Sequence, residues 1–288
     1  MFMYTHLPPR PTKLGIFRTR ELRLIGIHTR RTRERAMRLG KIYRVRRGWY
    51  ATPDAHPDLV TAVRHYGALT SLSACKIYGL WTPPTTDIFV AVPDFVRRSR
   101  TRGVTRRHLT AKLPGPLVSL DTALIHAARY EPFETALIVF ESAINKGLIQ
   151  INYARRLLKQ IPITRAERLL KRLCSGSQSG SETRVRNYIQ SLRFRVTPQK
   201  SINHVGRVDI FVHPRMIVEC DSRAHHTSMA NYQNDRSRSN SALICGFLTV
   251  RLTYEDIWLR WNETKIWIKY LLQHGFQRWK KPAYSPAS

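Results

Sequence analysis

The stretch Arg207-Val-Asp-Ile-Phe-Val-His-Pro-Arg-Met-Ile-Val-Glu-Cys-Asp221 decides how the C-terminal part of the chain folds. Polar and apolar residues alternate through 207–212 and again through 216–221, which is typical of strands with two different faces. Pro214 lies midway between the two runs and predicts a turn there. We therefore expect an antiparallel hairpin centred on Pro214.

Three carboxylates gather on one face of this hairpin. The turn brings Asp209 opposite Glu219, and alternation adds Asp221 to the same face. The opposite face is apolar and should be buried, with Val208, Ile210, Val212, Val218 and Cys220. Like charges across a strand pair are destabilising, so a cation should compensate them. Two sources stay open: a divalent metal such as Mg²⁺, which prefers oxygen ligands, or nearby arginines such as Arg207, Arg223 and Arg251.

The chain as a whole is strongly basic. Its 288 residues include 49 Lys and Arg against 19 Asp and Glu, which gives a net charge of +30. Such an excess points to a polyanion, most simply nucleic acid, although charge alone does not separate DNA from RNA. The longest apolar stretch, 135–149, is interrupted by Glu141, Asn145 and Lys146, and the basic N-terminus leads into no signal-peptide core. We expect a cytoplasmic, nucleoid-associated protein of bacterial or phage origin without a membrane partner.

Composition divides the chain into four parts. Six of the eight residues in 174–181 are Gly or Ser, which predicts a flexible linker, and 51–57 marks a softer boundary. The expected parts are 1–56, 57–173, the linker 174–181, and 182–288. The fold class is α+β. The last part reads as α-β-β-β-α-β-α, with helices at 182–192, 228–245 and 253–272 and strands at 195–199, 207–212, 216–221 and 248–252.

The N-terminal part predicts a basic helix followed by a hairpin. Residues 29–39 form the helix, with Thr32, Ala36 and Leu39 as its narrow apolar seam. The hairpin covers 41–50, with an Arg-Gly turn. A helix of this kind suits the DNA major groove, and the hairpin could contact the neighbouring backbone. A solvated charged face is the alternative. The predicted DNA-binding residues are Arg30, Arg31, Arg33, Arg35, Arg38, Arg44, Arg46 and Arg47.

Residues 14–160 resemble the abortive-infection type IV antitoxin family. The resemblance rests on Ile16-Phe-Arg-Thr-Arg-Glu-Leu-Arg-Leu-Ile-Gly26, Lys41-Ile-Tyr-Arg-Val-Arg-Arg-Gly-Trp-Tyr50, Ala68-Leu-Thr-Ser-Leu-Ser-Ala74 and Val118-Ser-Leu-Asp-Thr-Ala123. It implies an N-terminal winged helix, a mainly helical middle domain, DNA binding and autoregulation. It also implies a cognate toxin or another defence protein as a partner.

Residues 180–272 resemble the PD-(D/E)xK nuclease superfamily, in the branch related to very-short-patch-repair endonucleases. The resemblance rests on Asp209 and on Glu219-Cys-Asp-Ser-Arg-Ala-His-His226, with Gly246 and Val250-Arg-Leu-Thr253 further on. It implies a restriction-endonuclease-like fold and metal ligands on the hairpin. The chain departs from the family at Ser222, where the family has Gly, and at Ser239, where it often has Asp. Asp221 stands where many restriction enzymes have the catalytic lysine.

These residues predict a metal-dependent DNA endonuclease. Asp209, Glu219 and Asp221 are the expected ligands of Mg²⁺ or Mn²⁺, and Glu182 is expected beside them. His225 and His226 are candidates for the general acid or base, because imidazole titrates near neutral pH. The expected supporting residues are Asp235, Arg236, Arg238 and Arg251. Two alternatives stay open: a DNA-binding regulator of the antitoxin type with an inactive nuclease-like domain, and an RNA-directed enzyme or binder.

Overall fold

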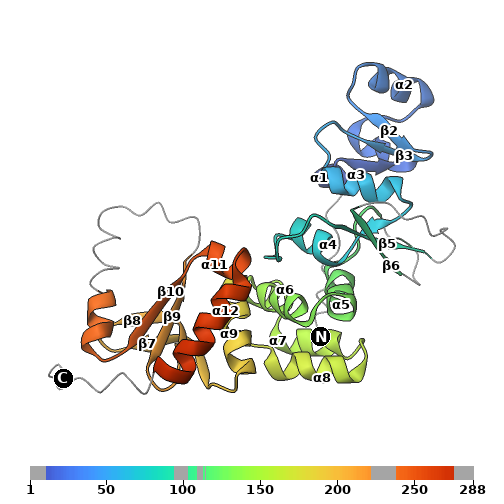
Figure 1. Cartoon of the computed structure of the whole chain (residues 1–288). Helices are drawn as coiled ribbons and strands as arrows, with labels where there is room; N and C mark the ends of the chain where they lie inside the picture. Colours follow the sequence, from blue (N-terminus) through green and yellow to red (C-terminus); the bar gives the residue numbers. More distant parts are fainter. Residues whose placement is uncertain (1–10, 94–102, 109–112, 114, 222–237, 276–288) are drawn as a thin grey trace. The chain divides into compact units, whose positions relative to one another are not determined.

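The computed structural model describes residues 11–93, 103–108, 113, 115–221 and 238–275 (Figure 1). The chain divides into two compact units. Unit 1 comprises 1–140 and 148–171, and unit 2 comprises 141–147 and 172–288. Each unit combines helices with small sheets, so the expected α+β fold is confirmed.

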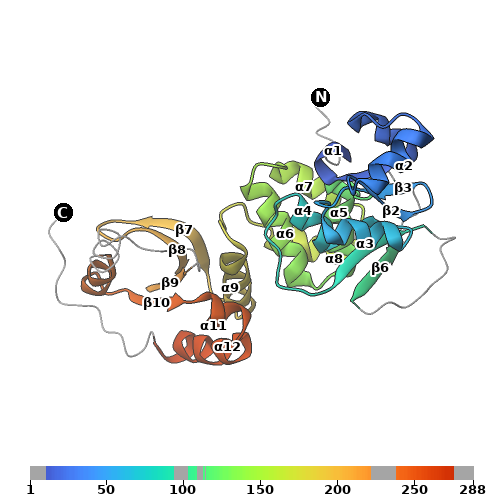
Figure 2. The same ribbon diagram turned by 90° about the horizontal axis from the view of Figure 1, so that it is seen from above.

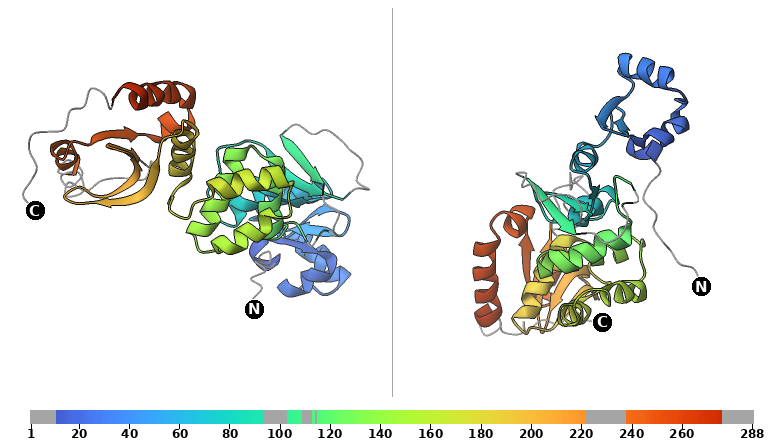
Figure 3. Two further views of the ribbon diagram at one scale, coloured as in Figure 1. Left: turned by 90° about the horizontal axis from the view of Figure 1, so that it is seen from below. Right: turned by 90° about the vertical axis from the view of Figure 1, so that its right-hand side faces the viewer.

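Unit 1 begins with a three-stranded sheet flanked by short helices (Figure 3, right). Its elements are α1 (Pro11–Leu14), β1 (Ile16–Arg18), the 3-10 helix η1 (Thr19–Ile25), α2 (Arg30–Arg38), β2 (Tyr43–Arg46) and β3 (Trp49–Ala51). The strand order is β1-β3-β2. Thr29 caps α2, because its hydroxyl accepts the Thr32 N–H at 3.1 Å. Gly40 adopts positive φ after α2, and Gly48 does so at the hairpin turn that the sequence predicts.

The packing of α2 differs from the expected apolar seam. Ala36 is the buried residue of this helix and joins a core with Phe17, Leu22, Ile42 and Tyr50. Thr32 is exposed, and Leu39 is 60% exposed. Ala36 is the one fully buried side chain of this nine-residue helix, and Arg33 adds a contact over the ring of Tyr50. Most of its surface therefore faces solvent.

The rest of unit 1 is mainly helical around a second small sheet. Its helices are α3 (Pro57–Arg64), α4 (Ser71–Ile77), α5 (Leu120–Tyr130), α6 (Phe133–Asn145), α7 (Ile151–Leu158) and α8 (Ile163–Arg172). Its strands are β4 (Ala68–Leu69), β5 (Ile88–Val92) and β6 (Val104–His108), in the order β4-β5-β6. Five residues at the end of α6, from Glu141 on, belong to unit 2.

Unit 2 is a four-stranded sheet with helices on both faces. Its elements are α9 (Gly180–Ser191), β7 (Val196–Ile202), β8 (Gly206–Val212), β9 (Met216–Cys220), a helical segment 238–244, β10 (Leu248–Leu252), α11 (Tyr254–Trp258), α12 (Trp261–Tyr270) and a π-helical turn η2 (Leu271–Gly275). The strand order is β10-β9-β8-β7, with β9 and β10 parallel and the other pairs antiparallel. Figure 2 shows α9, α11 and α12 on one side of this sheet.

Each face of the sheet has its own apolar core. Val185, Ile189 and Ile257 of the helices pack on one face, against Ile210 and Val218. On the other face, Phe211 and Ile217 pack with Ala242 of the segment 238–244. The acidic face of the hairpin is therefore also buried near the turn. The four predicted strands occur in the predicted order, although β7 continues three residues beyond its expected end at 199 and β9 ends one residue before 221. Of the predicted helix 228–245, residues 228–237 lie outside the described part of the chain.

The Ser/Gly-rich segment before α9 is held in place, which differs from the expected flexible linker. Cys174 N–H donates to Glu141 at 2.8 Å. The side chain of Ser177 is 2% exposed and accepts from Arg186 at 3.0 Å. Ser179 caps α9, because its hydroxyl accepts the Glu182 N–H at 3.1 Å. The helix accordingly starts at Gly180, two residues before the expected position.

The expected single helix 253–272 is two helices and a final turn. Thr253 caps α11 in a reciprocal pair with Asp256. Leu259 and Arg260 separate α11 from α12, and the Thr264 hydroxyl donates to the Asp256 carbonyl at 2.9 Å across the break. This side-chain bond satisfies a carbonyl at the end of α11 and lets the chain change direction there.

Candidate functional site

The hairpin register places the two central acids opposite each other. The ladder between β8 and β9 pairs Ile210 with Val218, Phe211 with Ile217 and Val212 with Met216. One step beyond Ile210–Val218 in this register, Asp209 faces Glu219. Asp209 N–H donates to Glu219 Oε2 at 3.1 Å, and Cys220 N–H donates to Asp209 Oδ2 at 2.9 Å. The register expected from the turn at Pro214 is confirmed.

The two neighbouring strands extend this rung into a row of polar residues. On β7, the pairs Pro198–Ile210 and Lys200–Val208 place Gln199 beside Asp209. On β10, Arg251 pairs with Glu219. The row therefore runs Gln199, Asp209, Glu219, Arg251 across the sheet. We call these four residues the polar row.

Gln199 was missed by the sequence analysis. Its backbone φ is 50°, which is in the left-handed region that non-glycine residues seldom adopt. Its side-chain Nε2 donates to Asp209 Oδ1 at 3.2 Å and to Glu182 Oε2 at 2.9 Å. A glutamine at the end of a predicted strand gives no local signal of such a contact, so the sequence offered no way to single it out.

Glu182 enters the site from the first turn of α9. The residue is 5% exposed, and its Oε2 also accepts the Gln178 N–H at 2.9 Å. Burial raises the pKa of Glu182, and the charge of Asp209 adds to this rise, while the hydrogen bond from Gln178 opposes it. The structure brings Glu182 and Asp209 together through the shared amide of Gln199.

The electrostatic cost of the cluster is clearest at Glu219. Burial, and after it the charge of Asp209, raises the pKa of the Glu219 carboxyl to about 7. Arg238 lies 3.2 Å from Glu219 Oε1 and opposes this rise. Burial raises the pKa of the Cys220 thiol, and nearby carboxylates, Asp209 foremost, raise it further. A cation in this region would offset both the burial of the negative charge and the repulsion between the carboxylates.

Asp221 differs from the other acids of the hairpin. Its carboxylate lies 3.6 Å from Arg251 Nε, and both side chains are nearly half exposed. This is the arginine-paired arrangement that the sequence analysis kept open. Among the described residues, no group of three or more His, Cys, Asp or Glu side chains stands close enough together to hold a metal ion.

The donor set nevertheless suits a hard divalent ion at two positions. Asp209 and Glu219 contribute carboxylate oxygens from facing positions of the hairpin. Mg²⁺ is usually bound through one or two carboxylates, with water and phosphate completing its shell. The two facing carboxylates therefore suit such an ion, whereas Asp221, which pairs with Arg251, does not complete the expected set of three.

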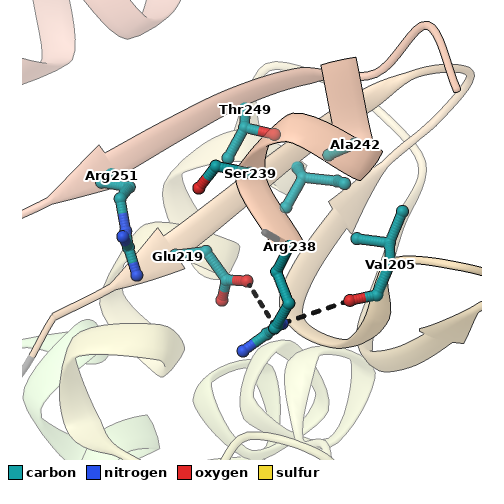
Figure 4. A pocket seen from close by; sticks show the side chains of 8 residues that line it. Val205, Glu219, Arg238, Ser239, Ala242, Thr249 and Arg251 are labelled. Carbon is teal, nitrogen blue, oxygen red and sulfur yellow. Dashed lines mark hydrogen bonds and ion pairs between the residues drawn. The ribbon is translucent and has the colours of Figure 1, made fainter. Parts of the chain in front are cut away.

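A small pocket adjoins Glu219 between the sheet and the segment 238–244 (Figure 4). The empty space, including its opening to solvent, is about 290 Å³. Its lining residues are Val205, Ile217, Glu219, Arg238, Ser239, Ala242, Thr249 and Arg251. Arg238 is anchored by the carbonyls of Val205 and Arg207 as well as by Glu219. The pocket thus combines an apolar floor with a carboxylate and two guanidinium groups.

Several predicted site residues lie outside the described part of the chain. They are His225, His226, Asp235 and Arg236, together with Ser222 and Arg223. Arg238 and Arg251 are described, and both stand beside acids of the hairpin.

In unit 1, the predicted DNA-binding arginines have different surroundings. Arg31, Arg35, Arg38, Arg44 and Arg47 are exposed. Arg30 pairs with Glu34 one turn away at 2.8 Å, and Arg33 packs over the ring of Tyr50. Arg46 is half-buried between the rings of Trp49 and Tyr66. A solvated charged face and a nucleic-acid interface both accommodate this arrangement.

Comparisons with known proteins add little. No family model matches the chain, and no curated protein does. It is similar to a solved structure, that of the RV2827C protein from Mycobacterium tuberculosis, with 15% identity over 62% of this chain and 82% of that chain and a TM-score of 0.31. A likeness at this level carries no argument about function. Within the described residues, no helix is both long and apolar enough to cross a bilayer.

Proposed function

We propose that the protein is a metal-dependent endonuclease that hydrolyses phosphodiester bonds in DNA and is guided to DNA by its basic N-terminal helix and hairpin. The observation that carries this proposal is the position of Asp209 opposite Glu219 on the hairpin, one step beyond the Ile210–Val218 pair, in a chain of net charge +30. A basic protein has ample arginine with which to neutralise acids singly. Two carboxylates that face each other, with Glu182 linked to them through Gln199, instead suit a shared cation.

In this proposal, Asp209 and Glu219 hold Mg²⁺ or Mn²⁺, and Glu182 lies beside them. When bound, such an ion activates a water and neutralises charge on phosphoryl oxygens. Arg238 and Arg251 line the adjoining pocket, where their charge supports binding of a phosphate group. His225 or His226 remains the proposed proton carrier, and Asp221 is assigned to pairing with Arg251 rather than to the metal.

The test is cleavage of supercoiled plasmid DNA in the presence of Mg²⁺ or Mn²⁺, with a chelator as control. We expect Asp209→Asn and Glu219→Gln to lose nicking and linearisation while binding to a DNA duplex persists in a gel-shift assay. Glu263→Gln removes an exposed acid of the same unit and should cleave as the native chain does. Equal cleavage by the Asp209→Asn, Glu219→Gln double variant would refute the assignment. An RNA substrate of the same length tests the RNA-directed alternative.

A second candidate is a DNA-binding regulator of the antitoxin type whose unit 2 is catalytically inactive. The contacts of Glu219 with Arg238 and of Asp221 with Arg251 favour it, because arginine already offsets part of the acidic charge. This candidate expects specific binding of the native protein to its own promoter DNA, and no cleavage with any divalent metal. Metal-dependent nicking by the native protein, but not by the Asp209→Asn, Glu219→Gln double variant, would exclude this candidate.

A further inference from the structure

One side chain joins two acids that come from different elements. Gln199 on β7 donates from one Nε2 atom to Glu182 on α9, at 2.9 Å, and to Asp209 on β8, at 3.2 Å. A primary amide carries two N–H groups, so this pair of bonds uses its full donor capacity. Glu182 and Asp209 are therefore oriented by a common group.

The chemistry of that group matters as much as its position. Lysine or arginine at this place would neutralise one of the acids. A neutral amide instead fixes the carboxylate oxygens by hydrogen bonds and leaves both negative charges in place. Asp209 Oδ1 retains a further lone pair beside its bond to Gln199. Glu182 Oε2 accepts from both Gln178 and Gln199, so Glu182 would contact a cation through its other oxygen, Oε1.

The backbone of Gln199 gives an independent indication. Its φ of 50° is unfavourable for a residue with a side chain, and the ladder between β7 and β8 contains regular pairs on both sides of it but none at Gln199–Asp209. Strained residues of this kind are concentrated at functional sites, where the surrounding structure maintains them. Here the departure from strand geometry coincides with the contact to the two acids.

We propose that Gln199 is a positioning residue, which holds the carboxylates of Glu182 and Asp209 in the orientation that a divalent cation requires. This inference rests on the proposed nuclease function. Removing a side chain that orients metal ligands commonly weakens metal affinity by about 10- to 100-fold. We expect a change of that size at Gln199.

The test measures Mn²⁺ binding to the full-length protein by electron paramagnetic resonance, in parallel with the metal concentration that gives half-maximal plasmid nicking. Gln199→Met keeps the length of the side chain and removes the amide. We expect its Mn²⁺ affinity to fall at least tenfold and the half-maximal metal concentration to rise by a similar factor, while nicking at saturating metal stays within about threefold. A loss of turnover with unchanged metal affinity would overturn the positioning role.

Two further variants keep the test decisive. Gln178→Met removes a neighbouring exposed amide, whereas the contact of Gln178 with Glu182 comes from its backbone N–H, so we expect native Mn²⁺ binding. Gln199→Asn tolerates positive φ better than glutamine but is one methylene too short to reach both acids, so it should fold and still bind Mn²⁺ weakly. Native affinity in folded Gln199→Asn would overturn the inference. If the native chain neither binds Mn²⁺ nor cleaves DNA, the proposed function itself fails.

Discussion

The buried ion pair between Glu141 and Arg186 predicts a large and specific loss of stability in unit 2. The two side chains are each 1% exposed and approach to 2.5 Å. Glu141 also accepts from Cys174 N–H at 2.8 Å and from the Thr183 hydroxyl at 2.6 Å. Replacement by alanine suits the helix that contains Glu141, so the loss will come from the removed carboxylate.

The magnitude follows from what Glu141→Ala leaves behind. Arg186 becomes a buried charge without its counterion, and breaking a buried pair in this way costs about 3–5 kcal/mol. Since about 1.4 kcal/mol is a tenfold change in an equilibrium constant, the unfolding constant of unit 2 should rise by a factor between about 10² and about 4 × 10³. Replacing both partners by apolar residues, Glu141→Leu with Arg186→Met, should restore most of the stability, because no buried charge then remains.

Hydrogen exchange followed by mass spectrometry separates this effect from changes elsewhere. Peptides from α9 and from the β8–β9 hairpin should lose protection in Glu141→Ala by the full 3–5 kcal/mol, about the cost of the broken pair, and regain most of it in the double variant. Glu263→Ala removes an exposed acid from a helix of the same unit and should leave these peptides unchanged. A loss below about 1 kcal/mol in Glu141→Ala would show that Arg186 reaches water, and would refute the reasoning.

Three further predictions concern unit 1. Burial, and after it the charge of Arg129, lowers the pKa of His126 to about 4, below its unfolded value of about 6.5. Between these pH values His126 is protonated in the unfolded state but not in the folded state. The contribution of neutral His126 to the free energy of unfolding is therefore complete above pH 6.5 and falls by at most about 3 kcal/mol as the pH drops to 4. Urea denaturation of the native chain and of His126→Gln checks this, and equal pH dependence in both would contradict it. Replacing Arg31 and Arg35 by alanine should weaken binding to any DNA duplex. The slope of log affinity against log salt concentration, measured by fluorescence anisotropy, should become smaller by about one for each lost phosphate contact. An unchanged slope would show that DNA binds at another surface of the protein. Gly48→Ala should destabilise the hairpin by about 1 kcal/mol, because the φ of +80° is unfavourable for a residue with a side chain. The added methyl group meets no neighbouring atom, so the backbone alone accounts for this cost. Unaltered thermal unfolding of the variant would contradict the prediction.

The parts of the site that the sequence could predict are those fixed by local rules. Alternation and a proline turn determine the hairpin register, so Asp209 and Glu219 could be paired before any coordinates were known. The same alternation placed Asp221 on their face, and Arg251 was one of three arginines considered as a counterion. The choice among these arginines depends on the pairing of β10 with β9, which alternation alone could not show.

The features that escaped prediction depend on contacts between distant residues or on choices among equivalent ones. Gln199 reaches two acids only because β7 leaves regular geometry at that residue. Several serines before α9 could cap it, and the selection of Ser179 depends on the tertiary contacts of the preceding segment. Glu141 interrupts an apolar stretch in the sequence, and nothing local marks it as the counterion of Arg186.

The position of Glu141 affects how this protein can be dissected. A gene fragment that begins at the serine-glycine stretch would encode α9 and the whole polar row, yet it would omit the carboxylate on which Arg186 depends. The segment that can be transplanted as a cassette, in the laboratory or during evolution, therefore has to start upstream of the last turns of α6 and not at the most obvious seam in the sequence.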